Sequence, residues 1–351
     1  MKKMRNMLSI ILVLILAVNL AACSTGKTQD TGKKADPGTE VKDDTTDTAP
    51  EKLTFGISMP QLDNDGFRAN LIGIQQAAEK FGIEIITSDA KNSADTQMQQ
   101  IEDFITKGVD AIVMCPIDSG ALAAAVQKAN TAGIPVSAFD RNVSDGELVG
   151  LAESDNRKHG EKAAELMAEA AQKNGFAVSD LQVLELQGAI ATSSGLERHE
   201  GFVQKAEELG LTIVASLPTE YKMDLAYSAV LDAFQANPDI NAIFIPSDNA
   251  CYSGVESALR QLDKLIPVGD EGHIILTSVD GGPQGLEGVR NDFIDGIAAQ
   301  SKLLMSEEAM LLAYKAVTGE PIENSIIRIL PTPVTKENVE DETLWANAIN
   351  K

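Results

Sequence analysis

Residues 111–141 read AIVMCPIDSGALAAAVQKANTAGIPVSAFDR, and this stretch decides the fold class. It opens with the short apolar run 111–115, continues through a stretch of helical length at about 119–132, and closes with a second apolar run at 135–139. Short runs rich in Val, Ile and Ala on either side of such a stretch are typical of two parallel strands joined by a helix. The stretch therefore predicts a β-α-β unit that ends at Asp140 and Arg141.

The same alternation continues on both sides of this unit, from about residue 53 to residue 317. Before the unit, strands are expected at 53–59 and 83–87, and helices at about 67–81 and 96–107. After it, the strand at 149–153 is expected to begin a second series, with further strands at 182–186, 212–217, 242–246, 274–279 and 294–298. The accompanying helices are expected at about 156–173, 194–209, 223–236, 249–262, 284–291 and 301–317. Two consecutive series over roughly 300 residues predict an α/β protein with two doubly wound parallel-sheet domains.

The first 23 residues have the pattern of an export signal. Lys2, Lys3 and Arg5 precede the apolar run 7–18, which is shorter than the about 20 residues of a bilayer-spanning helix. The closing Leu20-Ala21-Ala22-Cys23 resembles the lipobox of bacterial lipoproteins, in which the cysteine receives the lipid. We therefore expect a lipoprotein signal peptide at 1–23 and lipidation of Cys23, with a plain signal peptide or an uncleaved anchor as alternatives.

Residues 24–52 are rich in Thr, Asp, Lys, Gly and Pro, and Val41 is their only large apolar residue. Such a stretch cannot bury enough apolar surface to offset the entropy lost on ordering, so it predicts a disordered tether. An anchor, a tether and a globular body together predict an extracytoplasmic protein that a lipid holds at the cell membrane.

The net charge, the few cysteines and histidines, and the motifs of the sequence argue against several classes of function. A formal charge of -23 argues against nucleic acid as a partner. Cys115 and Cys251 lie far apart in the sequence and are expected to be separate buried thiols. The three histidines (His159, His199 and His273) are expected to pack within or on the surface of the fold. We find no cluster of metal ligands, no phosphate-binding glycine loop and no Ser-His-Asp pattern, so no metal, cofactor or catalytic residue is predicted.

Polar side chains follow the expected strands, at the ends where an open α/β sheet binds its ligands. In the first series these are residues 63–67, 115–116 and 140–142, and in the second they are 192–198, 220–221, 247–249, 280–282 and Gln300. Carboxylates accept from adjacent sugar hydroxyls, arginine forks donate to them, and amides do both. An aromatic ring covers the apolar face of a sugar. This set of side chains therefore points to a sugar ligand.

The body, from about residue 53 to 331, resembles the periplasmic sugar-binding proteins of the ribose/galactose type, and most closely their ribose-binding members. The most specific stretches are 139–141 (FDR), 184–188 (LELQG), 191–193 (ATS), 197–202 (ERHEGF), 279–281 (VDG) and 297–300 (IAAQ). The resemblance implies a type I periplasmic binding protein with a three-crossing hinge. We expect crossings near 153–155, 300–301 and 331. One lobe would then combine 53–154 with 301–331, and the other 155–300 with 332–351.

The resemblance also implies which residues bind the ligand. The residues at positions that bond sugar hydroxyls are Asn64, Asp140, Arg141, Arg198, Asp280 and Gln300. Phe67 and Tyr221 fall where the family's aromatic rings enclose the sugar. The family's pattern is not complete here, because Gly66 replaces a second aromatic, while Cys115 and Ser247 replace asparagines. Asp248, beside Ser247, is a further candidate contact.

Three functions fit these observations to different degrees. The first is a monomeric solute-binding lipoprotein that captures a monosaccharide (a pentose or hexose) or a polyol, and delivers it to the permease subunits of an ABC importer. The second is a receptor module that reports a sugar or a furanosyl signal molecule to a membrane sensor. The third, a carbohydrate-active enzyme, needs a carboxylic acid that donates a proton. Arg141 disfavours it, because a neighbouring arginine lowers the pKa of Asp140.

Overall fold

The computed structural model describes residues 52–349, and its first sheet is entirely parallel. The strands are β1 (Thr54–Met59), β2 (Glu84–Asp89), β3 (Ala111–Met114), β4 (Val136–Phe139), β5 (Gly150–Ser154) and β11 (Ile326–Ile329). Their order across the sheet is β11-β5-β4-β3-β1-β2. Every neighbouring pair is parallel. The carboxyl ends of all these strands therefore lie at one edge of the sheet.

The second sheet repeats this arrangement with one antiparallel edge. Its strands are β6 (Gln182–Gln187), β7 (Thr212–Pro218), β8 (Ala242–Ile245), β9 (Ile275–Asp280), β10 (Gly296–Ala299) and β12 (Thr332–Val334). The order is β12-β10-β9-β8-β6-β7, and only β12 runs antiparallel to its neighbour. The predicted fold class, two doubly wound α/β domains, is confirmed.

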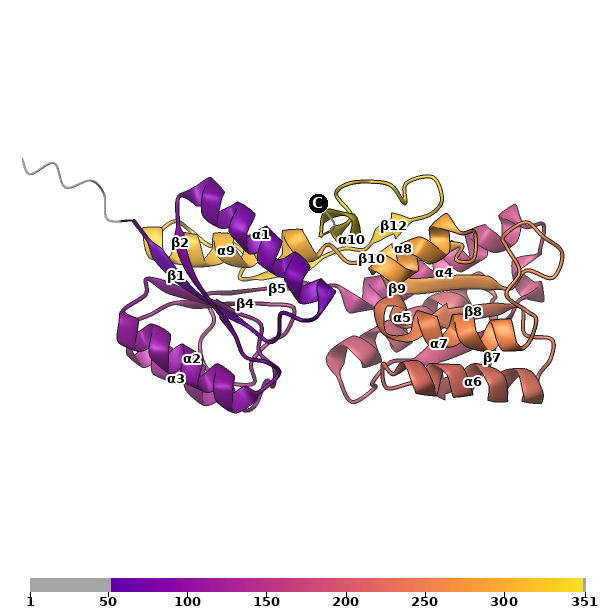
Figure 1. Ribbon diagram of the computed structural model, residues 1–351, viewed down its shortest axis with the longest axis horizontal. Helices are drawn as coiled ribbons and strands as arrows, with labels where there is room; N and C mark the ends of the chain where they lie inside the picture. The colour runs from indigo at the N-terminus through magenta and orange to yellow at the C-terminus, as the bar shows by residue number, and fades with distance from the viewer. Residues whose placement is uncertain (1–51, 350–351) are drawn as a thin grey trace, which may run out of the picture. The chain divides into compact units, whose positions relative to one another are not determined.

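Helices cover both faces of the first sheet (Figure 1). Helices α1 (Asp65–Phe81) and α9 (Lys302–Thr318) pack on one face and share a core with Phe55, Ile57 and Phe139. Helices α2 (Ala94–Lys107) and α3 (Ala123–Thr131) pack on the other face, over Ile112 and Met114. The strands are buried on both sides, which is why they appear in the sequence as unbroken apolar runs.

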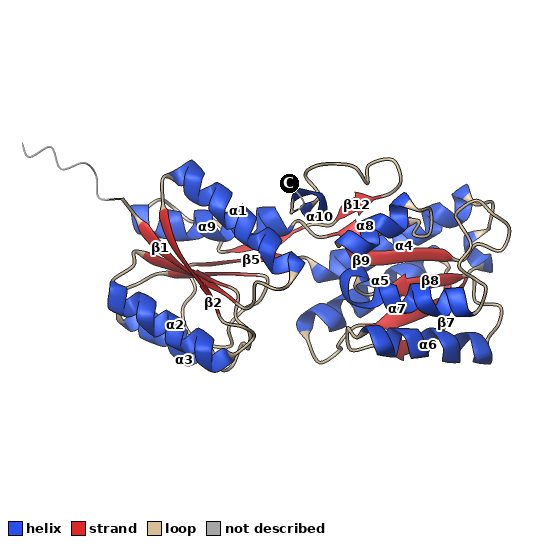
Figure 2. Ribbon diagram, viewed as in Figure 1, coloured by secondary structure: helices blue, strands red, loops and turns tan. Residues whose placement is uncertain are grey.

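The second domain has the same layers (Figure 2). Helices α4 (Asn156–Lys173) and α5 (Ser193–Leu209) share a core with Val183 and Phe244. Helices α6 (Met223–Ala236), α7 (Asp248–Gln261), α8 (Pro283–Arg290) and the short α10 (Trp345–Ala348) contribute to the core on the other face. A short 3-10 helix, Val178–Asp180, precedes β6.

The chain passes between the two sheets three times. It leaves the first sheet after β5, returns to it at β11, and leaves it again to form β12. The expectation that the strand at 149–153 begins the second series is wrong, because β5 pairs with β4 and β11 in the first sheet. An apolar run identifies a strand but not the sheet that it joins. The short elements β11, β12 and α10 were also not expected from the sequence.

Both cysteines of the body are buried and unpaired, as expected for separate thiols. The export signal, Cys23 and nearly all of the expected tether lie outside the described residues. Between residues 52 and 349, no helix has the length and apolar character needed to span a bilayer.

Candidate functional site

The first half of the site lies at the carboxyl end of β4. Asp140 directly follows β4 and has a φ of 65°, a left-handed conformation that few residues other than glycine adopt. Its Oδ1 lies 3.2 Å from Lys302 Nζ, and its Oδ2 lies 3.8 Å from Arg141 Nε. Burial by itself would raise the pKa of Asp140, but Lys302 and Arg141 together outweigh burial and lower it. Asp140 is therefore an ionised acceptor held between two cations.

The amino-terminal end of α1 lies beside Arg141. The guanidinium carbon of Arg141 is 5.7 Å from the centre of the Phe67 ring, within the range of a cation–π contact. Asn64 caps this helix, since its Oδ1 accepts from the main-chain N–H groups of Gly66 at 2.9 Å and Phe67 at 3.3 Å. The cap fixes the start of α1 and thereby the position of Phe67.

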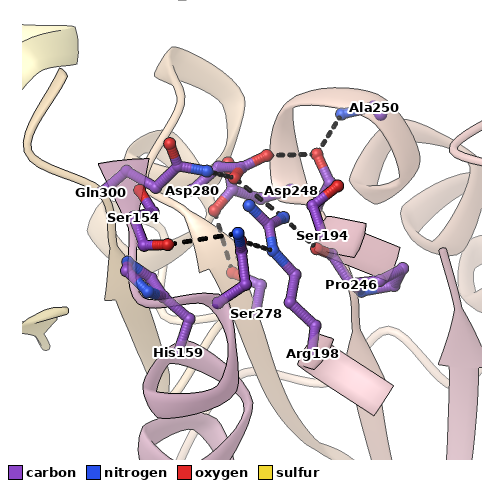
Figure 3. A network of polar contacts seen from close by, with 12 residues as sticks. Ser154, His159, Ser194, Arg198, Pro246, Asp248, Ala250, Ser278, Asp280 and Gln300 are labelled. Carbon is purple, nitrogen blue, oxygen red and sulfur yellow. Dashed lines mark hydrogen bonds and ion pairs between the residues drawn. The ribbon is translucent and has the colours of Figure 1, made fainter. Parts of the chain in front are cut away.

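The second half of the site centres on Asp280, the last residue of β9 (Figure 3). Its Oδ1 accepts from Gln300 Nε2 at 2.6 Å and lies 3.0 Å from Arg198 Nη1. Its Oδ2 accepts from the hydroxyl of Ser247. Burial by itself would raise the pKa of Asp280. The charge of Arg198 is the largest of the effects that lower it, and together they bring the pKa below its ordinary value. A buried ion pair between Asp280 and Arg198 thus forms the centre of this half.

Asp280 has an unusual backbone that the carboxyl-terminal tail holds in place. Its φ is 102°, outside the regions that side-chain-bearing residues favour. Trp345 in α10 donates from its indole Nε1 to the main-chain oxygen of Asp280 at 2.8 Å. A residue more than sixty positions away therefore helps to aim the Asp280 carboxylate.

Arg198 reaches this network because α4 and α5 cross with their backbones in contact. A Cβ atom on Gly160 would lie 2.2 Å from the carbonyl oxygen of Arg198, and one on Gly201 would lie 2.1 Å from that of Arg157. No larger residue fits at either position without moving a helix. The close crossing lets Arg198 Nε donate to Asn156 Oδ1, at the start of α4, over 3.0 Å.

Tyr221 provides the aromatic surface of this half. The guanidinium carbon of Arg198 lies 6.0 Å from the centre of the Tyr221 ring. Tyr221 has a φ of 54°. Its ring packs directly against Gly188, where a Cβ atom would lie only 2.3 Å from the ring. Arg198 Nη1 also donates to the main-chain oxygen of Pro246 at 2.8 Å. Arg198 is therefore fixed on several sides by the protein itself.

Residues from both domains line two cavities at the carboxyl ends of the strands. The larger cavity has a volume of about 960 Å³. Its lining includes Asp140, Arg141, Arg198, Tyr221, Asp280 and Gln300. The smaller cavity, of about 170 Å³, adds Asn64 and Phe67 and shares Asp140, Arg141, Asp280 and Lys302 with the larger one. The structure thus brings together eight of the nine expected ligand-binding residues, and we call the two cavities together the cleft.

Asp248 is the exception. It is fully buried and lines neither cavity. Its oxygens accept from the N–H groups of Gly281 at 2.9 Å and Gly282 at 2.7 Å, and from the Ser278 hydroxyl at 3.0 Å. Burial, followed by the charge of Asp280, raises the pKa of Asp248 to about 8. The structure does not support the expected ligand contact, because Asp248 instead supports the loop after β9.

The sequence reasoning missed several polar residues of the cleft, such as Asp118, Glu153 and Arg328, and two of those it missed, Asn156 and Lys302, begin helices. Both line the larger cavity, and each is the first residue of a helix that begins shortly after a strand. A signal was available, because each is a polar residue within three positions of a strand end. The set of strand-end residues considered from the sequence contained neither of them.

The three departures from the family pattern have different consequences. Gly66 lines the smaller cavity without a side chain. Ser247 takes part in the site through its bond to Asp280. Cys115 is fully buried beneath Asp140, with its Sγ 4.0 Å from Asp140 Oδ2. Burial raises the pKa of Cys115 to about 12, so its thiol is neutral at physiological pH.

The histidines line neither cavity. His159 Nδ1 lies 2.8 Å from the main-chain oxygen of Asp155, and His199 Nδ1 lies 2.6 Å from Glu185 Oε1. In the described part of the chain, no group of three or more His, Cys, Asp or Glu residues is arranged to hold a metal ion.

Comparison with known proteins agrees with this architecture. The family described as the periplasmic binding protein domain matches residues 55–321, which is most of the chain. The chain belongs to this family. The resemblance inferred from the sequence is thereby confirmed.

Among the chain's relatives are two whose names state a ligand. The ribose import binding protein RbsB of Bacillus subtilis is 30% identical over 323 residues, covering 92% of this chain and 97% of its own. The xylitol-binding protein of Mycolicibacterium smegmatis is 25% identical over 297 residues. The match covers 84% of this chain and 81% of that protein.

A solved structure shows the same fold with a ligand bound. It is an ABC transporter periplasmic solute binding protein from Actinobacillus succinogenes 130z with bound D-allose. Its sequence is 26% identical, its TM-score is 0.71, and the match covers 83% of this chain and 100% of that one.

Proposed function

We propose that this protein is an extracytoplasmic solute-binding protein that captures a monosaccharide, a pentose or a hexose, and delivers it to an ABC importer. The observation that carries the proposal is the pairing of a carboxylate with an arginine on each domain, Asp140 with Arg141 and Asp280 with Arg198, around one cleft. The ligands named for the relatives and the bound allose support a sugar or polyol as the ligand class.

The chemistry of the cleft suits a sugar ring. Asp140 and Asp280 accept from hydroxyls, while Arg141 and Arg198 donate to them, and bonds with a charged partner are the stronger kind. Gln300 adds an amide that both donates and accepts. Phe67 and Tyr221, each beside one of the arginines, offer flat surfaces for the C–H face of the ring. Asn64 would donate from its amide nitrogen, since its Oδ1 already accepts from the backbone of α1.

Binding is reversible capture, and we propose no catalytic role for the cleft carboxylates. Burial would raise the pKa values of both carboxyls. Arg198 is the group that most strongly lowers the pKa of Asp280, and Lys302 is the group that most strongly lowers the pKa of Asp140. Both carboxyls are therefore ionised at neutral pH and accept hydrogen bonds, whereas an enzyme that cleaves glycosidic bonds needs one carboxylic acid that donates a proton.

The domain limits follow from the same proposal. We propose one lobe of residues 53–154 with 301–331 and a second lobe of 155–300 with 332–351. The passages after β5, between β10 and β11, and between β11 and β12 support these limits. A ligand that contacts Asp140 and Asp280 together would join the two lobes.

We propose that lipid on Cys23 holds the protein at the cell membrane, with residues 24–52 as the tether. The Leu-Ala-Ala-Cys pattern at 20–23 supports this, as does the family, whose name places its members in the periplasm. The partners would be the permease subunits of an importer and the membrane, with the protein acting as a monomer.

A thermal-shift screen of the chain from residue 53 to 351 against pentoses, hexoses and polyols tests the ligand class. A ligand that binds only the folded state raises the melting temperature by mass action. We expect one sugar to raise it at micromolar concentration. The proposal fails if no sugar or polyol does so while a different class of small molecule does.

A further inference from the structure

Lys302 is a charged residue of the cleft that the proposed sugar contacts do not use. It is the first residue of α9, and its side chain is only 13% exposed. It lines both cavities, and its Nζ donates to Asp140 Oδ1 at 3.2 Å. Its backbone is also fixed, because Asn70 Nδ2 donates to the Lys302 main-chain oxygen at 2.7 Å.

Gly66 leaves room for this lysine. A Cβ atom on Gly66 would lie 3.6 Å from Lys302 Cε, so any longer side chain there would compete with the lysine stem for space. The lysine stem runs past the start of α1, close to Gly66, and its side chain lines the cleft. The smaller cavity therefore has the Phe67 ring and an ammonium group in its lining.

The pair that Lys302 forms with Asp140 has unused bonding capacity. An ammonium group has three N–H donors and no acceptor, and Asp140 takes one of them. Asp140 Oδ2 has only long contacts, 3.8 Å to Arg141 Nε and 4.0 Å to the Cys115 thiol, so it keeps acceptor capacity. A donor and an acceptor thus lie side by side at the cleft, a spacing that suits two adjacent hydroxyl oxygens.

Building on the proposed function, we propose that Lys302 is a ligand-binding residue that determines specificity. Lys302 donates to one oxygen of the sugar, while Asp140 accepts from the hydroxyl on the neighbouring carbon. The pair therefore selects monosaccharides with a vicinal diol on the side that faces α1.

The first test is the affinity of Lys302→Met for the sugar found in the thermal-shift screen, measured by calorimetry on the purified protein. Loss of a charge-assisted hydrogen bond should weaken binding roughly 10- to 100-fold. Lys302→Arg keeps the donors and should recover part of the affinity. Lys107→Met is the matched control, because Lys107 is exposed on α2, lines neither cavity, and its removal changes the net charge equally.

The second test separates a direct contact from an effect that acts through Asp140. The affinities of wild type, Lys302→Met and Asp140→Asn are compared for a series of monodeoxy analogues of the same sugar. In the wild type, removing either hydroxyl of the diol should cost affinity. Lys302→Met should abolish that cost at one carbon, and Asp140→Asn should abolish it at the adjacent carbon.

Two outcomes overturn the proposal. In one, the affinity lost on removing each hydroxyl of the sugar is the same in Lys302→Met as in the wild type. In the other, Lys302→Met abolishes the cost of removing a hydroxyl only at the carbon where Asp140→Asn also abolishes it. Lys302 would then only position Asp140 and would not itself contact the sugar. The ligand-free melting temperature of each variant shows whether it is folded. If no sugar binds to the wild type at all, the proposed function fails first, and that result is distinct from both outcomes.

Discussion

At the scale of single residues, the two carboxylates of the cleft are built alike. Asp140 and Asp280 each stand at the end of a strand, with φ values of 65° and 102°. Such conformations cost on the order of 1–3 kcal/mol each and persist only where the surroundings enforce them. The surroundings here are Lys302 and Arg141 in one case, and Arg198 and Trp345 in the other. The strain is therefore part of a preformed binding surface.

Arg141 offers the cleanest test of a direct ligand contact. Its side chain is 46% exposed, so Arg141→Ala should leave the fold intact. Truncating a charged group that becomes buried against a ligand costs roughly 2–5 kcal/mol, which is about 30-fold or more in affinity. Calorimetry with the screened sugar should show this loss. Asp145→Ala, on an exposed loop outside the cleft, should bind as the wild type does, and equal affinities of all three proteins would refute the contact.

The raised pKa of Asp248 predicts a pH-dependent stability. Its pKa is about 8 in the folded protein and roughly 4 in an unfolded chain, so the folded state holds the proton more tightly. This stabilisation is complete below the unfolded pKa and is lost as the pH rises through the folded pKa. The free energy of unfolding of wild type, relative to that of Asp248→Asn, should therefore fall between about pH 5 and pH 8. Urea unfolding at several pH values measures it, and a constant difference would contradict the shift.

At the scale of elements, the crossing of α4 and α5 decides where Arg198 lies. Gly201→Ala would place a Cβ atom 2.1 Å from the Arg157 carbonyl oxygen, which forces the helices apart. Overpacking of this kind typically costs about 1–3 kcal/mol. We expect a lower melting temperature together with weaker sugar binding, because Arg198 would move with α5. Gln204→Ala on the exposed side of α5 is the control, and unchanged binding in Gly201→Ala would show that the crossing does not position Arg198.

The long elements could be predicted from the sequence, whereas the short edge elements could not. The periodicity predicted α4 and α6 with their observed bounds. It missed β11 and β12, of four and three residues, which carry few buried side chains. These strands form because they can hydrogen-bond to the edge strand of a sheet that is already there. The local sequence pattern contains no information about that edge.

At the scale of the whole molecule, the division of the polar contacts between two sheets predicts a hinge motion. The larger cavity, at about 960 Å³, is at the upper end of the range for drug-sized ligands, and a monosaccharide is smaller. We therefore expect the two domains to close when the sugar binds, so that Arg141 and Arg198, which line opposite halves of the cleft, both contact one ring.

Small-angle X-ray scattering tests this closure. The radius of gyration of the body should decrease when the screened sugar is added at saturating concentration. At a concentration that just saturates the wild type, Arg141→Ala should show a smaller decrease, because its weaker site is only partly occupied. A wild type that binds the sugar with no change in its radius of gyration would contradict the hinge.

Much of the site was determined by the sequence alone, because the relevant information is local. Apolar runs between helical stretches specify parallel strands, and parallel strands bring their carboxyl ends to one edge. The amino-acid pattern therefore places Asp140 and Arg141 at the edge of one sheet and Asp280 and Gln300 at the edge of the other. That the two edges face one cleft was implied by the resemblance to the sugar-binding family and not by the pattern.

Tertiary structure alone decided the rest, since packing joins residues that no sequence spacing relates. It paired β5 with β4 and β11 in the first sheet, where the periodicity of the sequence had counted this strand with the second series. It buried Asp248 against the loop after β9, although the sequence places it at a strand end like the true cleft residues. It also brought Lys302 to Asp140 across 162 positions of the chain, past the start of α1 at Gly66.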